Sequence, residues 1–203
     1  MWWHLVIDAR CVVCGFGGTY LCVGCRTRAL GGRVETVVDG VPVLALGAYA
    51  GELRQVIRAA KNYRARGIVD DIREDIRELA EAAPRGAVAV PVPSSREGLR
   101  RRGYGLAASI ARAAGMRTVR ALRLLDGRSQ RGLGATERVR ERLMSASRVN
   151  HPIVVVDDVV TTGSTIRASI RALRAVRNDV ALVLVLAIVP NRVSSLPKPR
   201  ERV

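Results

Sequence analysis

The sequence predicts an α/β fold in which helices flank a mainly parallel, twisted sheet, preceded by a small cysteine-rich module. Hydrophobic residues make up 48% of the 203 residues but aromatic residues only 3%, so the core is aliphatic, as in parallel sheets covered by helices. Residues 153–188 read as a buried strand, a loop, an amphipathic helix and a second buried strand. All four cysteines lie within residues 11–25, ahead of this pattern.

The cysteines form two Cys-x-x-Cys pairs that are separated by seven residues. Two such pairs can place four thiolates around one ion, the tetrahedral arrangement of structural zinc. No secretory signal or membrane-spanning apolar run is visible, so we expect a cytoplasmic, reducing setting that disfavours disulfides, and a thiol redox site would need only one pair. We therefore predict that residues 1–35 form a zinc-ribbon-like module with Zn²⁺ held by Cys11, Cys14, Cys22 and Cys25.

The main domain is expected over residues 36–190 and begins with alternating strands and helices. Residues 41–51 are expected to form a strand or a hairpin that a glycine interrupts. Apolar residues at helical spacing predict a short helix that ends near Lys61. The same spacing predicts a longer helix whose apolar face runs from Val69 to Ala83, where the sequence PRG ends it.

A short strand over 87–93 and a helix over 106–114 are predicted next. Residues 116–150 carry nine arginines against three acids and are expected to form a long, partly helical excursion. Residues 191–203 are rich in proline and charge, which is typical of a disordered basic tail.

The most informative stretch is VVVDDVVTTGSTI, residues 154–166. In an open parallel sheet, ligands bind beyond the carboxyl ends of strands, where Asp157 and Asp158 are expected to lie. The next helix directs unpaired backbone amides and the positive end of its dipole to the same place, so a phosphate fits there. The loop between them supplies a glycine, which lets the backbone approach an anion, and small hydroxyl donors: Thr161, Thr162, Gly163, Ser164 and Thr165.

The two aspartates need a different partner, because carboxylates repel phosphate. Sugar hydroxyls or a bridging metal ion would suit them, and a sugar phosphate satisfies both halves of the motif. Adjacent residues of a regular strand point to opposite faces, so Asp157 and Asp158 can serve one ribose only if the strand has begun to turn.

The positive charge of the chain is almost entirely arginine. The net charge is +16, and only Lys61 and Lys198 are lysines. This composition fits a polyanionic partner, and it equally fits an arginine-rich surface without one. The arginines spaced along the helix after the motif are interpreted as a solvated outer face: Arg167, Arg171, Arg174 and Arg177.

The stretch VVVDDVVTTGSTI resembles the phosphoribosyl pyrophosphate (PRPP) motif of the type I phosphoribosyltransferases. With the four-cysteine N-terminus, ELRQVIRAAK and VPVPSSREGLRRRGY in the same order, the chain is similar to the ComF family of competence-associated, phosphoribosyltransferase-like proteins from Cys11 to Val189. The resemblance implies the type I phosphoribosyltransferase fold and binding of PRPP with Mg²⁺.

The resemblance also implies residue roles. Thr161–Thr165 would take the 5-phosphate, Asp157 and Asp158 the ribose hydroxyls, and Val159 and Val160 complete this substrate-binding motif. The pyrophosphate loop would comprise Val92, Pro93, Ser94, Ser95 and Arg96, assisted by Arg101 and Arg102. The excursion around Gln130 and Arg138 would close over the site as a lid. The candidate catalytic residues are Asp157, Asp158, Gln130 and Arg138.

The acceptor side departs from the family pattern, with Gly105 and Leu106 where asparagine and glutamine are usual. Three hypotheses follow. The chain is a transferase that displaces pyrophosphate with a nitrogen acceptor; a DNA-uptake factor whose partners are single-stranded DNA and a competence helicase-type protein; or a domain that senses PRPP without turnover. No membrane insertion is expected, and the sequence leaves a homo-oligomer open.

Overall fold

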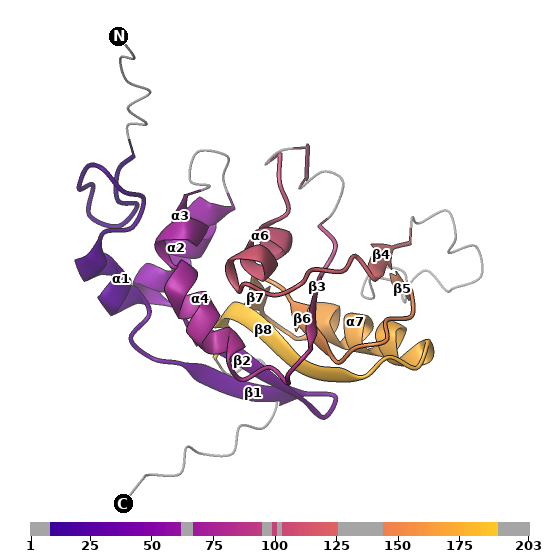
Figure 1. Ribbon diagram of the computed structural model, residues 1–203. Coiled ribbons are helices and arrows are strands. Elements are labelled where there is room, and N and C mark those ends of the chain that lie inside the picture. The colour runs from indigo at the N-terminus through magenta and orange to yellow at the C-terminus, as the bar shows by residue number, and fades with distance from the viewer. Residues whose placement is uncertain (1–8, 62–66, 95–98, 101–102, 126–143, 191–203) are drawn as a thin grey trace, which may run out of the picture.

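The computed structural model describes residues 9–61, 67–94, 99–100, 103–125 and 144–190. A six-stranded sheet forms its centre (Figure 1). The strand order is β1 (Val34–Val38), β2 (Val41–Ala48), β8 (Val180–Ile188), β6 (Ile153–Val156) and β3 (Val88–Pro91), and β7 (Val159–Val160) pairs with the end of β8. Within this six-stranded sheet, β1 pairs antiparallel with β2 and the other pairings between described strands are parallel, so the predicted mainly parallel sheet is confirmed.

Helices cover both faces of the sheet, as the two hydrophobic clusters show. One cluster joins one sheet face to α2 (Gly51–Ala60), α3 (Ile68–Asp71), α4 (Arg73–Ala80) and α6 (Leu106–Ala113). The other joins the opposite face to α7 (Ser164–Ala175) and to the ribbon of β4 (Leu122–Leu124) and β5 (Met144–Ala146). In β6, Val154 and Val156 pack into the first cluster and Ile153 and Val155 into the second, which is the alternation of a strand buried on both faces.

The N-terminal strands differ from the prediction. Residues 41–48 form one continuous strand, so the expected glycine break is wrong, and β1 pairs with it through a turn at Asp39 and Gly40. Both turn residues have left-handed φ angles, 49° and 76°, which is the conformation that an Asp-Gly hairpin turn favours. Gly47 lies within β2 at a point where Leu53 of α2 packs closely against the strand. A Cβ at this position would come within 2.9 Å of Leu53 Cδ2.

The predicted longer helix is broken at Ile72, between α3 and α4. Hydrophobic periodicity does not detect this break because Ile68, Ile72 and Ile76 are fully buried before, at and after it. The described parts of the excursion predicted as partly helical, residues 116–125 and 144–150, contain the β4–β5 ribbon and no helix. Residues 126–143 and the tail 191–203 lie outside the described residues. Among the helices that the structure describes, none has the length and apolar character needed to cross a membrane.

Candidate functional site at the carboxyl edge of the sheet

Strands β3 and β6 bring two predicted loops to the same edge of the sheet. They pair in parallel with Pro91 opposite Val156, so they end together. The Val92 amide donates to the Val156 carbonyl at 2.8 Å, which continues the pairing one residue further. Pro93 and Ser94 follow at once and are half-buried. The start of the predicted pyrophosphate loop therefore lies next to the strand that leads into the two aspartates.

Asp157 and Asp158 directly follow β6 and lie outside regular strand, between β6 and β7. The Asp158 carbonyl accepts from the amides of Leu186 and Ala187 at 3.0 and 3.3 Å, so the backbone stays attached to β8. The Asp157 carboxylate turns back and accepts from the Asp158 amide at 2.9 Å. Both carboxylates are half-buried at the place where ligands of parallel sheets bind.

The lysine at the end of α2 contacts Asp158, a role that its sequence context does not indicate. Lys61 ends α2, and its Nζ lies 3.0 Å from Asp158 Oδ1. The Tyr104 hydroxyl donates to the carbonyl of Ala60, so the segment after β3 also contacts the end of α2. No local motif could have revealed the ion pair, because its partners are far apart in the sequence.

The loop after β7 has the features predicted for phosphate binding. Gly163 is the N-cap of α7 with a left-handed φ of 77°, and the first turn of this twelve-residue helix contains no acid. Thr161, Thr162 and Ser164 are exposed, and Thr162 Oγ1 donates to Ser164 Oγ at 3.2 Å. A small pocket opens here, lined by Val159, Val160, Thr161, Gly163, Ser164, Thr165 and Ile166. The positive end of the α7 dipole therefore faces a hollow rimmed by small hydroxyl side chains.

Arg167 lies in the first turn of α7 and contacts this loop, so its interpretation as part of a solvated outer face is not supported. It is half-buried, and its guanidinium donates to the Thr162 carbonyl. Side chains in a first helical turn point back toward the N-terminus, which brings the guanidinium over the loop. Arg171, Arg174 and Arg177, further along the helix, are exposed as predicted.

Replacing Gly163 with alanine is expected to destabilise the protein by about 1–2 kcal/mol, because a left-handed φ strains any L side chain. The new Cβ would meet the Arg167 guanidinium at 3.4–3.5 Å, an ordinary van der Waals contact, so the expected loss comes from the φ angle. Chemical denaturation measures the effect. Gly32→Ala is the matched control, since its Cβ meets nothing within 4 Å and its φ is not left-handed. Equal stability losses in the two variants would contradict this account of the loop.

The acceptor-side departure has a structural counterpart. Gly105 is the N-cap of α6, and a Cβ there would lie 3.6 Å from Ser94 Oγ, so this position borders the predicted pyrophosphate loop. Leu106 is buried in the core and offers no polar group. The remaining predicted site residues lie outside the described residues: Ser95, Arg96, Arg101, Arg102, Gln130 and Arg138.

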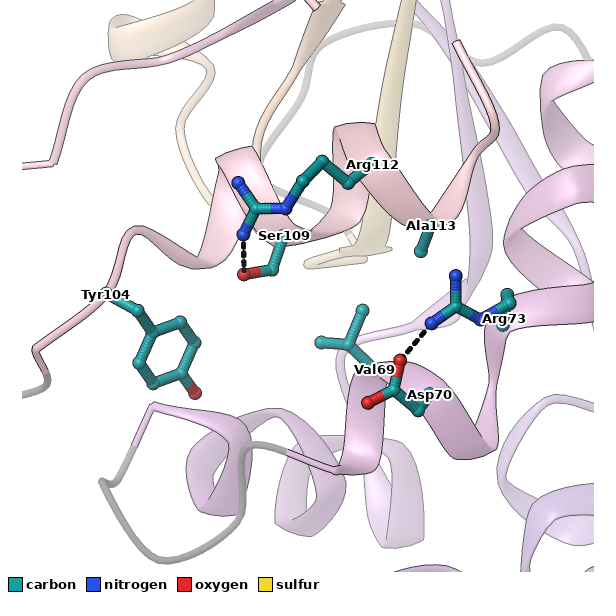
Figure 2. Close-up of a pocket in the computed structure, with 7 residues that line it drawn as sticks. All are labelled: Val69, Asp70, Arg73, Tyr104, Ser109, Arg112 and Ala113. Atoms are coloured by element: carbon teal, nitrogen blue, oxygen red, sulfur yellow. Dashed lines mark hydrogen bonds and ion pairs between the residues drawn. The ribbon is translucent and has the colours of Figure 1, made fainter.

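A second hollow, of about 370 Å³, lies between α3 and α6 and contains none of the predicted site residues. Figure 2 shows Arg73 paired with Asp70 on the α3 side and Arg112 bonded to Ser109 on the α6 side. Tyr104 stands at one end, with its hydroxyl directed toward α2. Both arginines that line this hollow are thus already bonded to nearby residues, Arg73 of α4 to Asp70 of α3 and Arg112 to Ser109 within α6.

The four cysteines converge as the spacing predicts. Their sulfur atoms all lie within 4.8 Å of one another, the Cys14 and Cys22 sulfurs are 3.7 Å apart, and all four thiols are free. Sulfurs that each lie about 2.3 Å from a tetrahedral zinc ion are about 3.8 Å apart. Cys22 is the N-cap of α1 (Val23–Ala29), and Cys25 is buried within its first turn. The donor set therefore fits Zn²⁺.

The thiols influence each other's ionisation. Burial alone raises the pKa of Cys11, but hydrogen bonds from the backbone of Cys22, Cys14 and Val13 and from the Cys14 thiol lower it to about 6. Burial, followed by hydrogen bonds with the other three cysteines, raises the pKa of Cys25 to about 12. Without a cation, these opposite shifts favour the thiolate at Cys11 over the thiolate at Cys25. A divalent metal would hold all four as thiolates and release protons.

The cysteine module is attached to the helices of the main domain. Asp71 of α3 accepts hydrogen bonds from Thr19 Oγ1 at 3.0 Å and from the Leu21 amide at 2.8 Å. Arg26 of α1 pairs with Asp75 of α4 at 2.7 Å. The buried cysteines belong to the same hydrophobic cluster as α2, α3 and α4. The module thus packs on the helical layer that positions Lys61.

Comparison with known proteins adds a family to this geometry. The family described as "Phosphoribosyl transferase domain" matches residues 98–200, about half of the chain, including both aspartates and the loop before α7. The chain is also similar to the crystal structure of a purine phosphoribosyltransferase from Pyrococcus horikoshii Ot3, with 19% identity, a TM-score of 0.35, and coverage of 64% of this chain and 76% of that chain. Among curated proteins, none matches the chain.

Proposed function

Because the chain belongs to the phosphoribosyl transferase domain family, we propose that it binds PRPP at the carboxyl edge of its sheet. The observation that carries the proposal is the pairing of two unlike features at one edge. The Gly163-capped N-terminus of α7 suits a phosphate, and the adjacent carboxylates of Asp157 and Asp158 suit sugar hydroxyls. A phosphate alone would not need the acids, and a sugar alone would not need the loop.

In the proposed complex, the amides and hydroxyls of Thr161–Thr165 hold the 5-phosphate, and the two aspartates accept hydrogen bonds from the ribose. Pro93 and Ser94 begin the loop that holds the diphosphate, with Ser95, Arg96, Arg101 and Arg102 expected to complete it. Hydroxyl and carboxylate oxygens are hard ligands that suit Mg²⁺. When bound to the diphosphate, Mg²⁺ would stabilise the charge that develops on this leaving group.

Transfer is the second part of the proposal. A nitrogen lone pair would form a bond to the anomeric carbon, the bond from that carbon to pyrophosphate would break with its electrons leaving on oxygen, and the nitrogen would lose its proton to water. Closure of the segment around Gln130 and Arg138 would exclude competing water. Leu106 is buried where the family pattern has a polar residue on the acceptor side. We therefore expect this chain to bind PRPP but to transfer its phosphoribosyl group slowly.

We further infer membership of the ComF family. Its support is the converged cysteine cluster together with ELRQVIRAAK, which forms α2 and ends in the lysine that contacts Asp158. The competence hypothesis, with single-stranded DNA and a helicase-type partner, is supported by the net charge of +16. Binding of oligonucleotides that weakens steeply with salt would support it, and salt-independent or absent binding would exclude it.

Calorimetric titration of PRPP with Mg²⁺ into the full chain tests the proposal. Ribose 5-phosphate and pyrophosphate, titrated separately, show which half of the site binds. Saturable binding of PRPP that exceeds both fragments supports the proposal, and no binding with or without Mg²⁺ overturns it. If PRPP binds, pyrophosphate release with a panel of nucleobases and amines then separates a transferase from a domain that only senses PRPP.

A further inference from the structure

We propose that Lys61 is a positioning residue of the sugar-phosphate site, and that it acts by holding Asp158 ready for a ribose hydroxyl. This inference rests on the proposed function, because it assigns a role within the same site. Its basis is the contact of Lys61 Nζ with Asp158 Oδ1 at 3.0 Å. The contact uses one carboxylate oxygen, so the second oxygen is left to accept from a ligand.

The end of α2 is held in place from two sides, which gives Lys61 a defined direction of approach. The Lys61 amide donates to the carbonyl of Ile57 at 3.0 Å, so its backbone still belongs to the helix. The carbonyl of the preceding Ala60 accepts from the Tyr104 hydroxyl. Only 34% of the Lys61 side chain and 23% of the Asp158 side chain are exposed, so the pair is shielded from bulk water on most sides.

The residue type supports a specific role. The chain has 34 lysines and arginines, and Lys61 is the only lysine before residue 198. An arginine would present a wide, planar fork that engages both oxygens of a carboxylate. The compact ammonium of lysine engages one oxygen as a point charge and keeps further donors for a neighbouring anion. At a site that must bind both hydroxyls and phosphates, the lysine suits both tasks.

The charge of Lys61 also resolves an electrostatic conflict. Two adjacent carboxylates repel an incoming sugar phosphate, and one ammonium offsets one of those charges. The same ammonium disfavours a divalent cation bound directly to Asp158, because both are positive. The charge of Lys61 therefore favours a sugar hydroxyl over a metal ion at Asp158, in agreement with the role that the family resemblance implies.

The test compares Lys61→Met with Arg58→Met, which removes a positive charge from the last turn of the same helix at an exposed position. Lys61→Met is expected to weaken PRPP binding by about 10- to 100-fold, the usual range for loss of a charged hydrogen-bond partner. Arg58→Met should change it by less than about twofold, as expected for a screened surface charge. Thermal unfolding should stay within about 2 °C of the wild type in both variants, since partly exposed ion pairs contribute little stability.

Asp158→Asn and the double variant Lys61→Met/Asp158→Asn show whether Lys61 acts through Asp158. If it does, the Lys61 change adds little once Asp158 is already neutral. Titration of Mn²⁺ alone gives a second readout, since Lys61→Met should gain affinity for the ion and the double variant should not.

If the wild type binds PRPP and Lys61→Met binds it equally well, the role of Lys61 is overturned while the proposed function stands. Additive losses in the double variant would overturn the mechanism through Asp158. Absence of PRPP binding in the wild type would overturn the proposed function and this inference with it.

Discussion

Replacing Asp157 and Asp158 together with alanine is expected to weaken PRPP binding by at least about 100-fold, because hydrogen bonds to charged groups contribute about 1.5–3 kcal/mol each. The fold should stay intact. The Asp158 backbone remains bonded to β8, the Asp157 carboxylate accepts a hydrogen bond within its own turn, and the ion pair of Asp158 is partly exposed. Calorimetric titration and thermal unfolding of the same preparations measure the two effects separately.

Asp179→Ala is the matched control for this double variant. Asp179 is an exposed aspartate that precedes β8 at the amino edge of the sheet, and it is held through its backbone carbonyl, which accepts from the Ile153 amide at 2.8 Å. We expect this variant to bind PRPP like the wild type. Normal PRPP binding by the Asp157 and Asp158 variant would show that the ligand site lies elsewhere.

Replacing Cys11 with serine is expected to abolish zinc binding and to lower the free energy of unfolding by more than about 3 kcal/mol, since binding of a structural metal contributes directly to folding. A serine hydroxyl is a poor substitute for a buried thiolate. Metal analysis and chemical denaturation measure the two consequences. Phe16→Ser is the control, because Phe16 lies between the cysteine pairs and is 66% exposed.

The loss should spread beyond the module. Asp71 and Asp75 bond to residues 19–26, so α3 and α4 lose partners when the cysteine cluster opens. Amide hydrogen exchange should therefore accelerate in α3 and α4 but not in α7, on the opposite face of the sheet. Zinc content equal to the wild type would remove the four-thiolate assignment. Faster exchange confined to residues 9–30 would show that the module unfolds independently.

Much of the fold was predictable where one local pattern decided it. Uninterrupted aliphatic runs identified β6 and β8, and apolar residues at helical spacing identified α2, α6 and α7. Local patterns did not suffice where a broken helix resembles a continuous one or where a strand is very short. A helix broken at Ile72 has the same buried positions as a continuous one, and Leu122–Leu124 is too short to be recognised as a strand until its partner is known.

The site divides in the same way. Sequence alone brought together the aspartates, the loop at residues 161–165 and the four cysteines, because each group is contiguous or nearly so. It missed Lys61 and misplaced Arg167, whose roles depend on contacts across elements or on the direction of a side chain. It also gave no sign that Gly105 borders Ser94, since helix α6 and strand β3 meet only in the folded protein.

By itself, the sequence determined the fold class, the type I phosphoribosyltransferase-like motif and the cysteine donor set, because periodicity and short-range spacing are properties of neighbouring residues. Only the tertiary structure decided which charge faces Asp158, which helices carry the cysteine module and how the aliphatic layers divide across the sheet. The physical reason is that these contacts join residues far apart along the chain, and their geometry exists only after the sheet has brought its strands side by side.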